Sequence, residues 1–376
     1  MSANPFVELH RLGQSVWFDN ISRGMIVSGQ LQRMIEEDGL RGVTSNPTIF
    51  HKAITGSSDY KDDLRQATSR GLTGPEEVFY MLAYRDIRMA ADCFLGVYEE
   101  SQGADGYVSI EVSPHLARDT ERTISQARRI IAAIGRRNVL VKVPATTEGI
   151  PAIEVLIAEG INVNVTLLFS IDRYAEIADA YLRGLEARAR QGKPLDSVAS
   201  VASFFVSRVD TMVDGLLQER MAQRKSDAEV SELRELLGKA AVANAKLAYQ
   251  RYRSILSDSR FLQLKDKGAR PQRVLWASTS TKNPDYNDLL YVEELIGRDT
   301  VTTLPPATYE ALKDHGKVEP TVEKDIHAAE DVVQKLSGFG ISLQDVTSRL
   351  EDDGVRKFAE SHDAIMSALA AEMTTR

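Results

Sequence analysis

The sequence predicts an α/β protein, specifically a (β/α)8 TIM barrel with extra helices in two long connections and a helical C-terminal extension. Three observations lead to this prediction. Short β-branched runs alternate with amphipathic helical stretches, as in parallel βα units. Eight such runs occur, which matches a closed barrel, although an open doubly wound sheet has the same local pattern. No Pro/Gly/Ser-rich linker divides the chain, so we expect a single domain over residues 1–376.

The predicted strands are rich in Val, Ile, Thr and aromatic residues, which favour a pleated, half-buried surface. In chain order they are SVWFDN (15–20), RGVTSN (41–46), YVSIEV (107–112), NVLVKV (138–143), INVNVTLL (161–168), SVASVASFF (197–205), RVLWAS (273–278) and TVTTL (300–304). Amphipathic stretches such as 118–137 and 170–192 predict the helices between them.

Helical patterns also fill the parts of the chain that lack strands. The long connections at about residues 47–106 and 209–272 are predicted to be helical insertions. The stretch 317–376 is helical as well, with a capping-box-like pattern from Ser342 to Asp345. Its last helix carries one apolar stripe, so we expect it to dock on the protein, with the barrel mouth as a candidate place. The stripe consists of Val355, Phe358, Ile365, Met366 and Leu369.

The alternation of side chains along the strands predicts a functional site. Side chains on a strand alternate between two faces, and in the first five strands one face is apolar. The other face carries polar groups near the C-terminal end of the strand, where the active-site side chains of a barrel gather. We therefore expect one ring of polar residues at the mouth: Asp19, Thr44, Asn46, Glu111, Lys142, Asn164, Thr166, Ser203 and Ser278.

Lys142 is the most informative member of this ring. The other five residues of Val139–Pro144 are apolar, and an apolar wall disfavours the charged form of an amine. An uncharged amine that faces a carbonyl forms a Schiff base, which stabilises a carbanion beside it. Asp19 and Glu111 then offer two acid/base groups. The alternative is structural, because an isolated strand lysine more often pairs with a carboxylate than it catalyses.

Bulk properties exclude several classes of function. The net charge is −8, so we expect no nucleic-acid or anionic-membrane partner, and an anionic ligand needs local cations. No apolar run is long enough to span a bilayer. The single cysteine, Cys93, and the lack of a basic, apolar leader predict a cytoplasmic location. The six histidines are scattered without ligand spacing, and no nucleotide motif follows a strand, so we expect no metal and no cofactor.

The chain resembles the transaldolases, in their longer bacterial form, which belong to the class I Schiff-base aldolases. The similar segments are SVWFDNISR (15–23), GVTSNPTIF (42–50), VSIEVSP (108–114), NVLVKVPATTEGI (138–150), INVNVTLLFS (161–170), VASFFVSRVD (201–210) and LWASTSTKNP (275–284). The resemblance implies a transferase of carbohydrate metabolism, in the pentose phosphate pathway, that needs no cofactor. Such an enzyme moves a dihydroxyacetone unit from sedoheptulose 7-phosphate or fructose 6-phosphate to glyceraldehyde 3-phosphate or erythrose 4-phosphate.

The resemblance also implies roles for individual residues. Lys142 matches the lysine that attacks the C2 ketone, and Asp19 matches the base that removes the C4 hydroxyl proton. Glu111, with Thr166 and a water, matches the proton shuttle of imine formation. The retained hydroxyls would be held by Asn46, Asn164 and Ser203, with Thr44 behind them.

The substrate phosphate requires cations near the ends of the late strands. Arg208 follows the sixth predicted strand, and Ser278 and Lys282 lie at and just after the end of the seventh. Relatives carry an arginine close after the seventh-strand serine, where this chain has Lys282 as its nearest cation. A surface ion pair is the alternative for Arg208.

Phe205 bears on the type of reaction. Related fructose 6-phosphate aldolases carry a tyrosine there, and a phenylalanine has no hydroxyl to orient water, which favours transfer over simple cleavage. Core packing is the alternative for this residue. Three alternatives to the transferase stay open: a lyase that uses the same imine, a sugar-phosphate isomerase with Glu111 as base and Lys142 as electrostatic partner, and a sugar-phosphate-binding barrel without catalysis.

Overall fold

The computed structural model describes residues 4–374. Within these residues, eight parallel strands close into a barrel in sequence order, with the last strand paired to the first. They are β1 (Gln14–Phe18), β2 (Gly42–Val43), β3 (Tyr107–Glu111), β4 (Val139–Pro144), β5 (Val163–Leu168), β6 (Ser200–Phe205), β7 (Arg273–Ala277) and β8 (Thr300–Leu304). The closed barrel confirms the predicted fold class, and every strand overlaps its predicted run.

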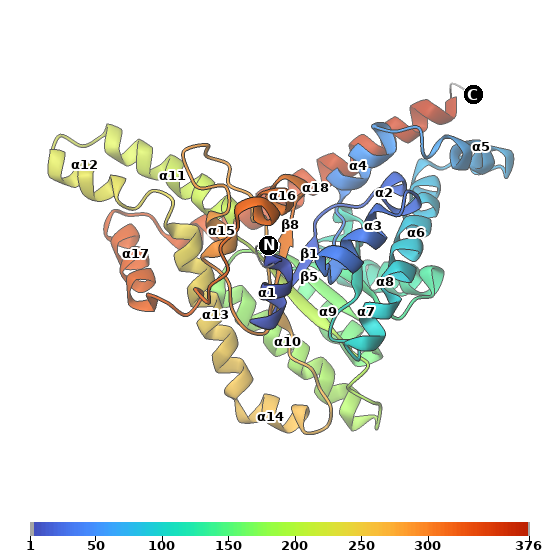
Figure 1. Cartoon of the computed structure of the whole chain (residues 1–376), viewed down its shortest axis with the longest axis horizontal. Coiled ribbons are helices and arrows are strands. Elements are labelled where there is room, and N and C mark those ends of the chain that lie inside the picture. The colour runs from blue at the N-terminus through green and yellow to red at the C-terminus, as the bar shows by residue number, and fades with distance from the viewer. Residues whose placement is uncertain (1–3, 375–376) are drawn as a thin grey trace.

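Helices surround the barrel and fill its long connections (Figure 1). The connection after β2 holds α4 (Pro47–Thr55), α5 (Lys61–Ser69), α6 (Pro75–Cys93) and α7 (Leu95–Glu100). The connection after β6 holds α11 (Ser207–Ala222), α12 (Asp227–Arg234), α13 (Ala240–Ser257) and α14 (Ser259–Lys265). Between β3 and β6 lie η2 (Pro114–Leu116), α8 (Thr120–Ile134), α9 (Gly149–Glu159) and α10 (Ile171–Arg190).

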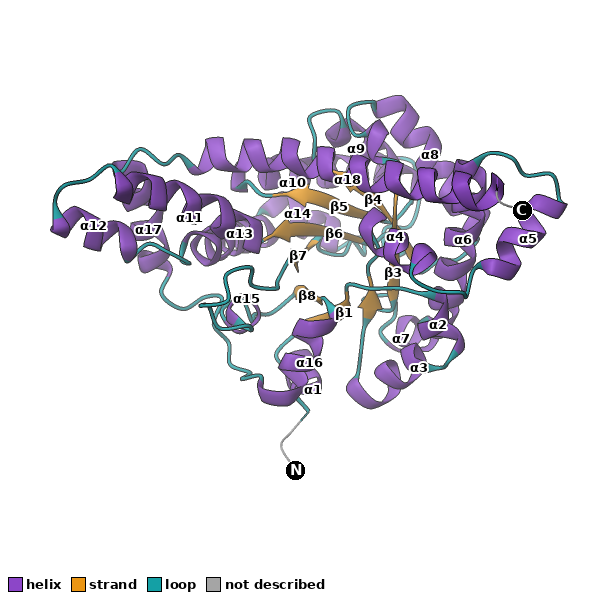
Figure 2. Cartoon of the chain, turned by 90° about the horizontal axis from the view of Figure 1, so that it is seen from above, coloured by secondary structure: helices purple, strands orange, loops and turns teal. Residues whose placement is uncertain are grey.

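The remaining helices lie near the two ends of the described chain and between β7 and β8. They are α1 (Pro5–Arg11), α2 (Arg23–Val27), α3 (Gln30–Arg33), η1 (Met34–Asp38), α15 (Leu290–Glu293), α16 (Pro306–His315), α17 (Ile326–Gly338) and α18 (Leu343–Thr374). Helices α11, α12, α13 and α17 gather on one side of the barrel, and α2 to α7 gather on the other (Figure 2). None of the helices in the described part combines the length and apolar character that crossing a membrane requires.

The N-terminal part of the barrel interior holds the rings of Trp17 and Tyr107, whose centres lie 6.3 Å apart, and a polar cluster. The indole of Trp17 is fully buried, and a Cβ on Gly42 would lie only 2.7 Å from it, so the missing side chain in β2 makes room for the ring. Asp105 accepts hydrogen bonds from Trp17 Nε1 (3.2 Å) and Ser15 Oγ (2.6 Å) and forms an ion pair with Arg273 (2.8 Å). These side chains occupy the N-terminal end of the barrel, whereas the polar C-terminal ends of the strands face the opposite mouth.

Helix α18 docks through its predicted apolar stripe. The backbone N–H of Asp345 donates to Ser342 Oγ (3.2 Å), as the capping pattern predicts. Phe358, Ile365 and Leu369 are buried. Leu167 lies where the pairing of β5 with β6 is irregular, between Val165 and Leu168. A Cβ on Gly354 would lie 2.9 Å from the Leu167 side chain, so the glycine lets α18 lie close to the barrel mouth.

Candidate active site

The C-terminal ends of the strands surround a cavity of about 580 Å³. Most of the predicted site residues line it: Asp19, Thr44, Asn46, Lys142, Thr166, Ser203, Phe205, Arg208, Ser278 and Lys282. The other two, Glu111 and Asn164, lie on the strands that flank Lys142, at its level in the sheet register. The structure therefore brings the predicted residues into one place.

Lys142 lies on the floor of the cavity beside a carboxylate. Strand register places Glu111 opposite Lys142, and Nζ lies 2.6 Å from Glu111 Oε1. Nζ also donates to the carbonyl oxygen of Ser45 (2.9 Å), and the lysine is only 5% exposed. The predicted apolar wall is thus only part of its surroundings, because the cross-strand neighbour on this face is an acid.

The side chain of Glu111 is only 8% exposed. Burial raises its pKa above the ordinary value, and the positive charge of Lys142 offsets part of that effect. Its Oε1 lies 2.6 Å from the lysine nitrogen, within the distance over which a proton can pass between the two groups. The pair therefore offers a route to a nucleophilic lysine that does not depend on desolvation alone.

Asp19 lines the cavity directly after the end of β1. Its Oδ1 accepts a hydrogen bond from Thr44 Oγ1 (2.6 Å), which fixes the carboxylate while Thr44 itself lines the cavity. Asn46 also lines the cavity, and its side-chain oxygen caps α4 by accepting from the N–H of Ile49 (2.9 Å). The caps and hydrogen bonds hold these groups in fixed positions before any substrate binds.

Asn164 lies below the cavity floor and supports other residues. Its side chain is fully buried, donates to Ser109 Oγ (3.1 Å) and accepts from Ser203 Oγ (2.6 Å). Thr166 lies two residues after Asn164, on the same face of β5, and is opposite Pro144 of β4. Within residues 4–374, its buried Oγ1 has no hydrogen-bond partner, which is unusual enough to suggest a water or ligand there.

Arg208 lies in the cavity wall between two aromatic rings. Its guanidinium carbon is 5.2 Å from the centre of the Phe205 ring and 5.9 Å from that of Phe358. Among residues 4–374 its buried Nη1 has no hydrogen-bond partner and no carboxylate forms an ion pair with it, so the surface ion pair is excluded as an alternative within this part of the chain. Burial lowers its pKa, although Asp353, Glu111 and Asp19 act in the opposite direction.

Lys282 adds a second positive charge to the same wall. Its Nζ donates to Ser280 Oγ (2.6 Å), and burial, followed by the charge of Arg208, lowers its pKa. Ser278 has a left-handed backbone (φ 58°), which non-glycine residues rarely adopt, and its hydroxyl lies 2.9 Å from that of Ser207. The positive charges of Arg208 and Lys282 favour an anionic ligand in this part of the cavity. The strained backbone of Ser278 is typical of ligand-binding sites.

The structure adds residues that the strand pattern missed. Asn20, Lys52, Ser280 and Phe358 also line the cavity. Asn20 is the last residue of the first predicted strand, and Ser280 lies two residues beyond the end of the seventh. Phe358 belongs to the predicted stripe of the last helix, so each of the three had a partial signal in the sequence. Lys52, on α4, had none.

The fold and the site together define a barrel enzyme whose central group is a buried lysine paired with an acid. A family model described as "Transaldolase/Fructose-6-phosphate aldolase" matches residues 16–369. The chain is 47% identical over 371 residues to the "Transaldolase" of Trichodesmium erythraeum (strain IMS101), covering 98% of this chain and 97% of that protein. It is 48% identical over 362 residues to the "Transaldolase" of Thiobacillus denitrificans (strain ATCC 25259 / T1), covering 96% and 98%. It is 46% identical over 371 residues to that of Thermobifida fusca (strain YX), covering 98% of each chain.

The chain belongs to the transaldolase/fructose-6-phosphate aldolase family.

Proposed function

We propose that this enzyme is a transaldolase, which transfers a dihydroxyacetone unit between sugar phosphates through a Schiff base on Lys142. Sedoheptulose 7-phosphate or fructose 6-phosphate is the donor, and glyceraldehyde 3-phosphate or erythrose 4-phosphate is the acceptor. The observation that carries the proposal is the pairing of Lys142 with Glu111 (2.6 Å) on the floor of a cavity whose wall holds Arg208 without an ion-pair partner among residues 4–374. A cytoplasmic location also fits the single cysteine, Cys93.

Imine formation begins with loss of a proton from Lys142. Glu111, whose Oε1 lies 2.6 Å from Nζ, accepts it, and burial assists the transfer because it raises the pKa of this carboxyl. The free amine adds to the C2 ketone and gives a carbinolamine, which then loses its hydroxyl as water. Glu111 returns the proton for that loss, and the unpartnered hydroxyl of Thr166 is placed to bind the water that relays it.

Carbon–carbon cleavage requires a base on the other side of the substrate. Asp19 removes the proton of the C4 hydroxyl, the C3–C4 bond breaks, and its electrons move into the protonated imine to give an enamine. The aldose phosphate leaves with C4 as its aldehyde carbon. Asn46 and Ser203 bind the hydroxyls of the retained unit, while Asn164 holds Ser203 in position through its 2.6 Å hydrogen bond.

The enamine can react with an aldehyde or be protonated from water. Phe205 lines the cavity, packs against Phe169 (5.2 Å between ring centres) and carries no hydroxyl that could position a water. Transfer therefore prevails over release of dihydroxyacetone. A lyase would require a proton donor at this point of the wall.

A mixture of fructose 6-phosphate and erythrose 4-phosphate tests the transfer. We expect sedoheptulose 7-phosphate and glyceraldehyde 3-phosphate to form in equal amounts, with little free dihydroxyacetone, as measured by chromatography and mass spectrometry. Release of dihydroxyacetone at the same rate with and without erythrose 4-phosphate would show a lyase instead. Formation of glucose 6-phosphate without any adduct on the protein would show an isomerase.

Arg208 provides the main contact to the substrate phosphate in this proposal, so Arg208→Met should raise KM for fructose 6-phosphate. A hydrogen bond to a charged group contributes about 1.5–3 kcal/mol, which corresponds to roughly a 10- to 100-fold change. Steady-state kinetics measure the effect, and unphosphorylated fructose, which lacks the anion, should show less than about a threefold change in kcat/KM.

Arg220→Met is the matched control, because Arg220 lies near the other end of α11 and is not among the cavity-lining residues described. An equal loss with fructose and with fructose 6-phosphate in Arg208→Met would mean that Arg208 does not bind the phosphate.

A further inference from the structure

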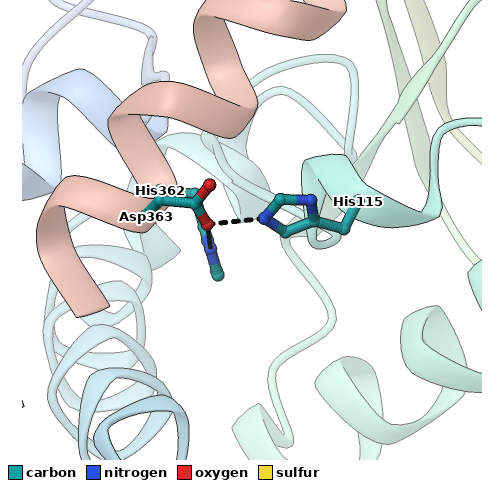
Figure 3. A group of neighbouring side chains, drawn as sticks. All are labelled: His115, His362 and Asp363. Carbon is teal, nitrogen blue, oxygen red and sulfur yellow. Dashed lines mark hydrogen bonds and ion pairs between the residues drawn. The ribbon is translucent and has the colours of Figure 1, made fainter. Parts of the chain in front are cut away.

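His115 meets His362 and Asp363, two adjacent residues from a distant part of the sequence, where α18 lies beside η2 (Figure 3). His115 lies on η2, directly after the loop that follows β3, and His362 and Asp363 lie on α18. His115 Nε2 lies 2.7 Å from Asp363 Oδ1, and His362 Nδ1 lies 4.0 Å from the same oxygen. One ligand atom from each residue can be chosen so that all three lie within 4.8 Å of one another.

His362 is buried without a hydrogen bond. It is 4% exposed, and neither ring nitrogen has a hydrogen-bond partner in the described part of the chain. Buried polar atoms of this kind are rare and call for a ligand, an ion or a water.

We propose that His115, His362 and Asp363 form a binding site for Zn²⁺ that fastens α18 to the barrel. Two imidazole nitrogens and one carboxylate oxygen are a common ligand set for zinc. Ligand bonds of about 2.0–2.1 Å in a tetrahedron place ligand atoms roughly 3.3 Å apart. The two histidine–aspartate separations here are 2.7 and 4.0 Å, and all three ligand atoms lie within 4.8 Å of one another. Modest side-chain rotations therefore suffice to bind the ion.

The surroundings of the site suit a metal that exchanges with solvent. The side chains of His115 and Asp363 are 50% and 61% exposed, so an ion can enter and a water can serve as the fourth ligand. The ring of Phe79 packs edge-on against His362, with ring centres 5.8 Å apart, and supports the buried ligand. The prediction of no metal site rested on spacing along the chain, and His115 and Asp363 are 248 positions apart.

The site is close enough to the cavity to influence it. His362 borders a small crevice that Asn46 and Glu111 also line, and Phe358, one turn earlier on α18, lies in the cavity wall beside Arg208. Zinc would hold this turn of α18 in place without taking part in the chemistry at Lys142.

Zinc titration of the chelator-stripped full chain tests the proposal by calorimetry. We expect one strong site per chain. His115→Ala and Asp363→Asn should each weaken zinc binding by more than about 100-fold, because even residues that only support a ligand contribute roughly 10- to 100-fold. Both side chains are at least half exposed, so these variants should keep the fold, as circular dichroism would verify.

His315→Ala is the matched control. His315 is similarly exposed and contacts two carboxylates, Asp288 (3.2 Å) and Asp314 (3.1 Å), but it has no second imidazole nearby among the described metal-binding groups. Its variant should bind zinc as the unmodified chain does. Zinc affinity that is unchanged in His115→Ala and Asp363→Asn, or lost in His315→Ala, would overturn the proposal.

Two further measurements separate a fastened helix from a loose surface site. Zinc at about 100 times its Kd should raise Tm by roughly 3 °C, from mass action and the unfolding entropy of a chain of this length. Hydrogen exchange should slow in α18 and η2 on zinc addition, and neither effect should occur in His115→Ala. Zinc binding that leaves exchange in α18 unchanged would refute the fastening of the helix.

Discussion

Replacing Lys142 by methionine is expected to lower kcat by more than about 10⁴-fold, on the scale of losses caused by removing a covalent catalytic group. Methionine keeps the length and apolar stem of the side chain but cannot form an imine, so the reaction loses its electron sink. The transfer assay measures the loss of turnover. Borohydride reduction with fructose 6-phosphate gives a second measure, because the unmodified chain should retain a three-carbon unit on Lys142 and the variant should retain none.

Lys246→Met is a close control for this experiment. Lys246 is also 5% exposed, and its Nζ likewise contacts a carboxylate, Glu294 (3.0 Å), and a backbone carbonyl, that of Lys324 (3.2 Å). It lies on α13, outside the cavity. This variant should lose stability but keep its kcat and its adduct on Lys142. Turnover that survives in Lys142→Met would eliminate the Schiff-base mechanism and leave the isomerase or binding alternatives.

Replacing Asp19 by asparagine is expected to lower kcat by about 10³-fold, within the range of general acid–base effects. The amide oxygen can still accept the hydrogen bond that Thr44 donates to Asp19 (2.6 Å), so the local structure should persist. The amide cannot remove the C4 hydroxyl proton, and the imine should form without cleavage. Mass spectrometry after borohydride reduction should therefore find a six-carbon adduct on Lys142 instead of the three-carbon unit.

The size of the trapped adduct distinguishes the base from a structural residue. A variant that merely distorts the cavity would trap less adduct of the usual three-carbon size. A three-carbon adduct that forms in Asp19→Asn as fast as in the unmodified chain would assign the base to another residue. Asp62→Asn, at an exposed position on α5 paired with Arg65, serves as the control and should behave like the unmodified chain.

The fold could be predicted from the sequence because strands and helices have different periods, and the eight runs lie in the right order. Alternation along the strands also brought Asp19, Lys142 and Thr166 to the mouth, since neighbouring parallel strands end at the same side of a barrel. Alternation does not reveal register, however. The Glu111–Lys142 pair depends on which residue of β3 lies opposite which residue of β4, and the sequence allowed Asp19 as a partner equally well.

The alternation of side chains along the strands could not predict contacts that depend on how the helices pack. The stripe of α18 predicted docking, but the place of Phe358 beside Arg208 depends on the close approach at Gly354. Lys52 lines the cavity because of the direction that α4 takes after β2. The carbonyl of Ser45 that accepts a hydrogen bond from Lys142 is a backbone group, so no side-chain pattern could predict it. His115 and His362 meet only once α18 has packed, so no spacing rule along the chain could find them.

The position of Phe358 has a consequence for biosynthesis. Asp19 is made early and Phe358 late, yet both line the same cavity. A ribosome must therefore complete all eight strands and the first half of α18 before the cavity has its full wall. A nascent chain that has formed only its barrel already holds Lys142 beside Glu111, but Arg208 still lacks one of its two flanking rings, so the wall of the cavity is completed late in translation.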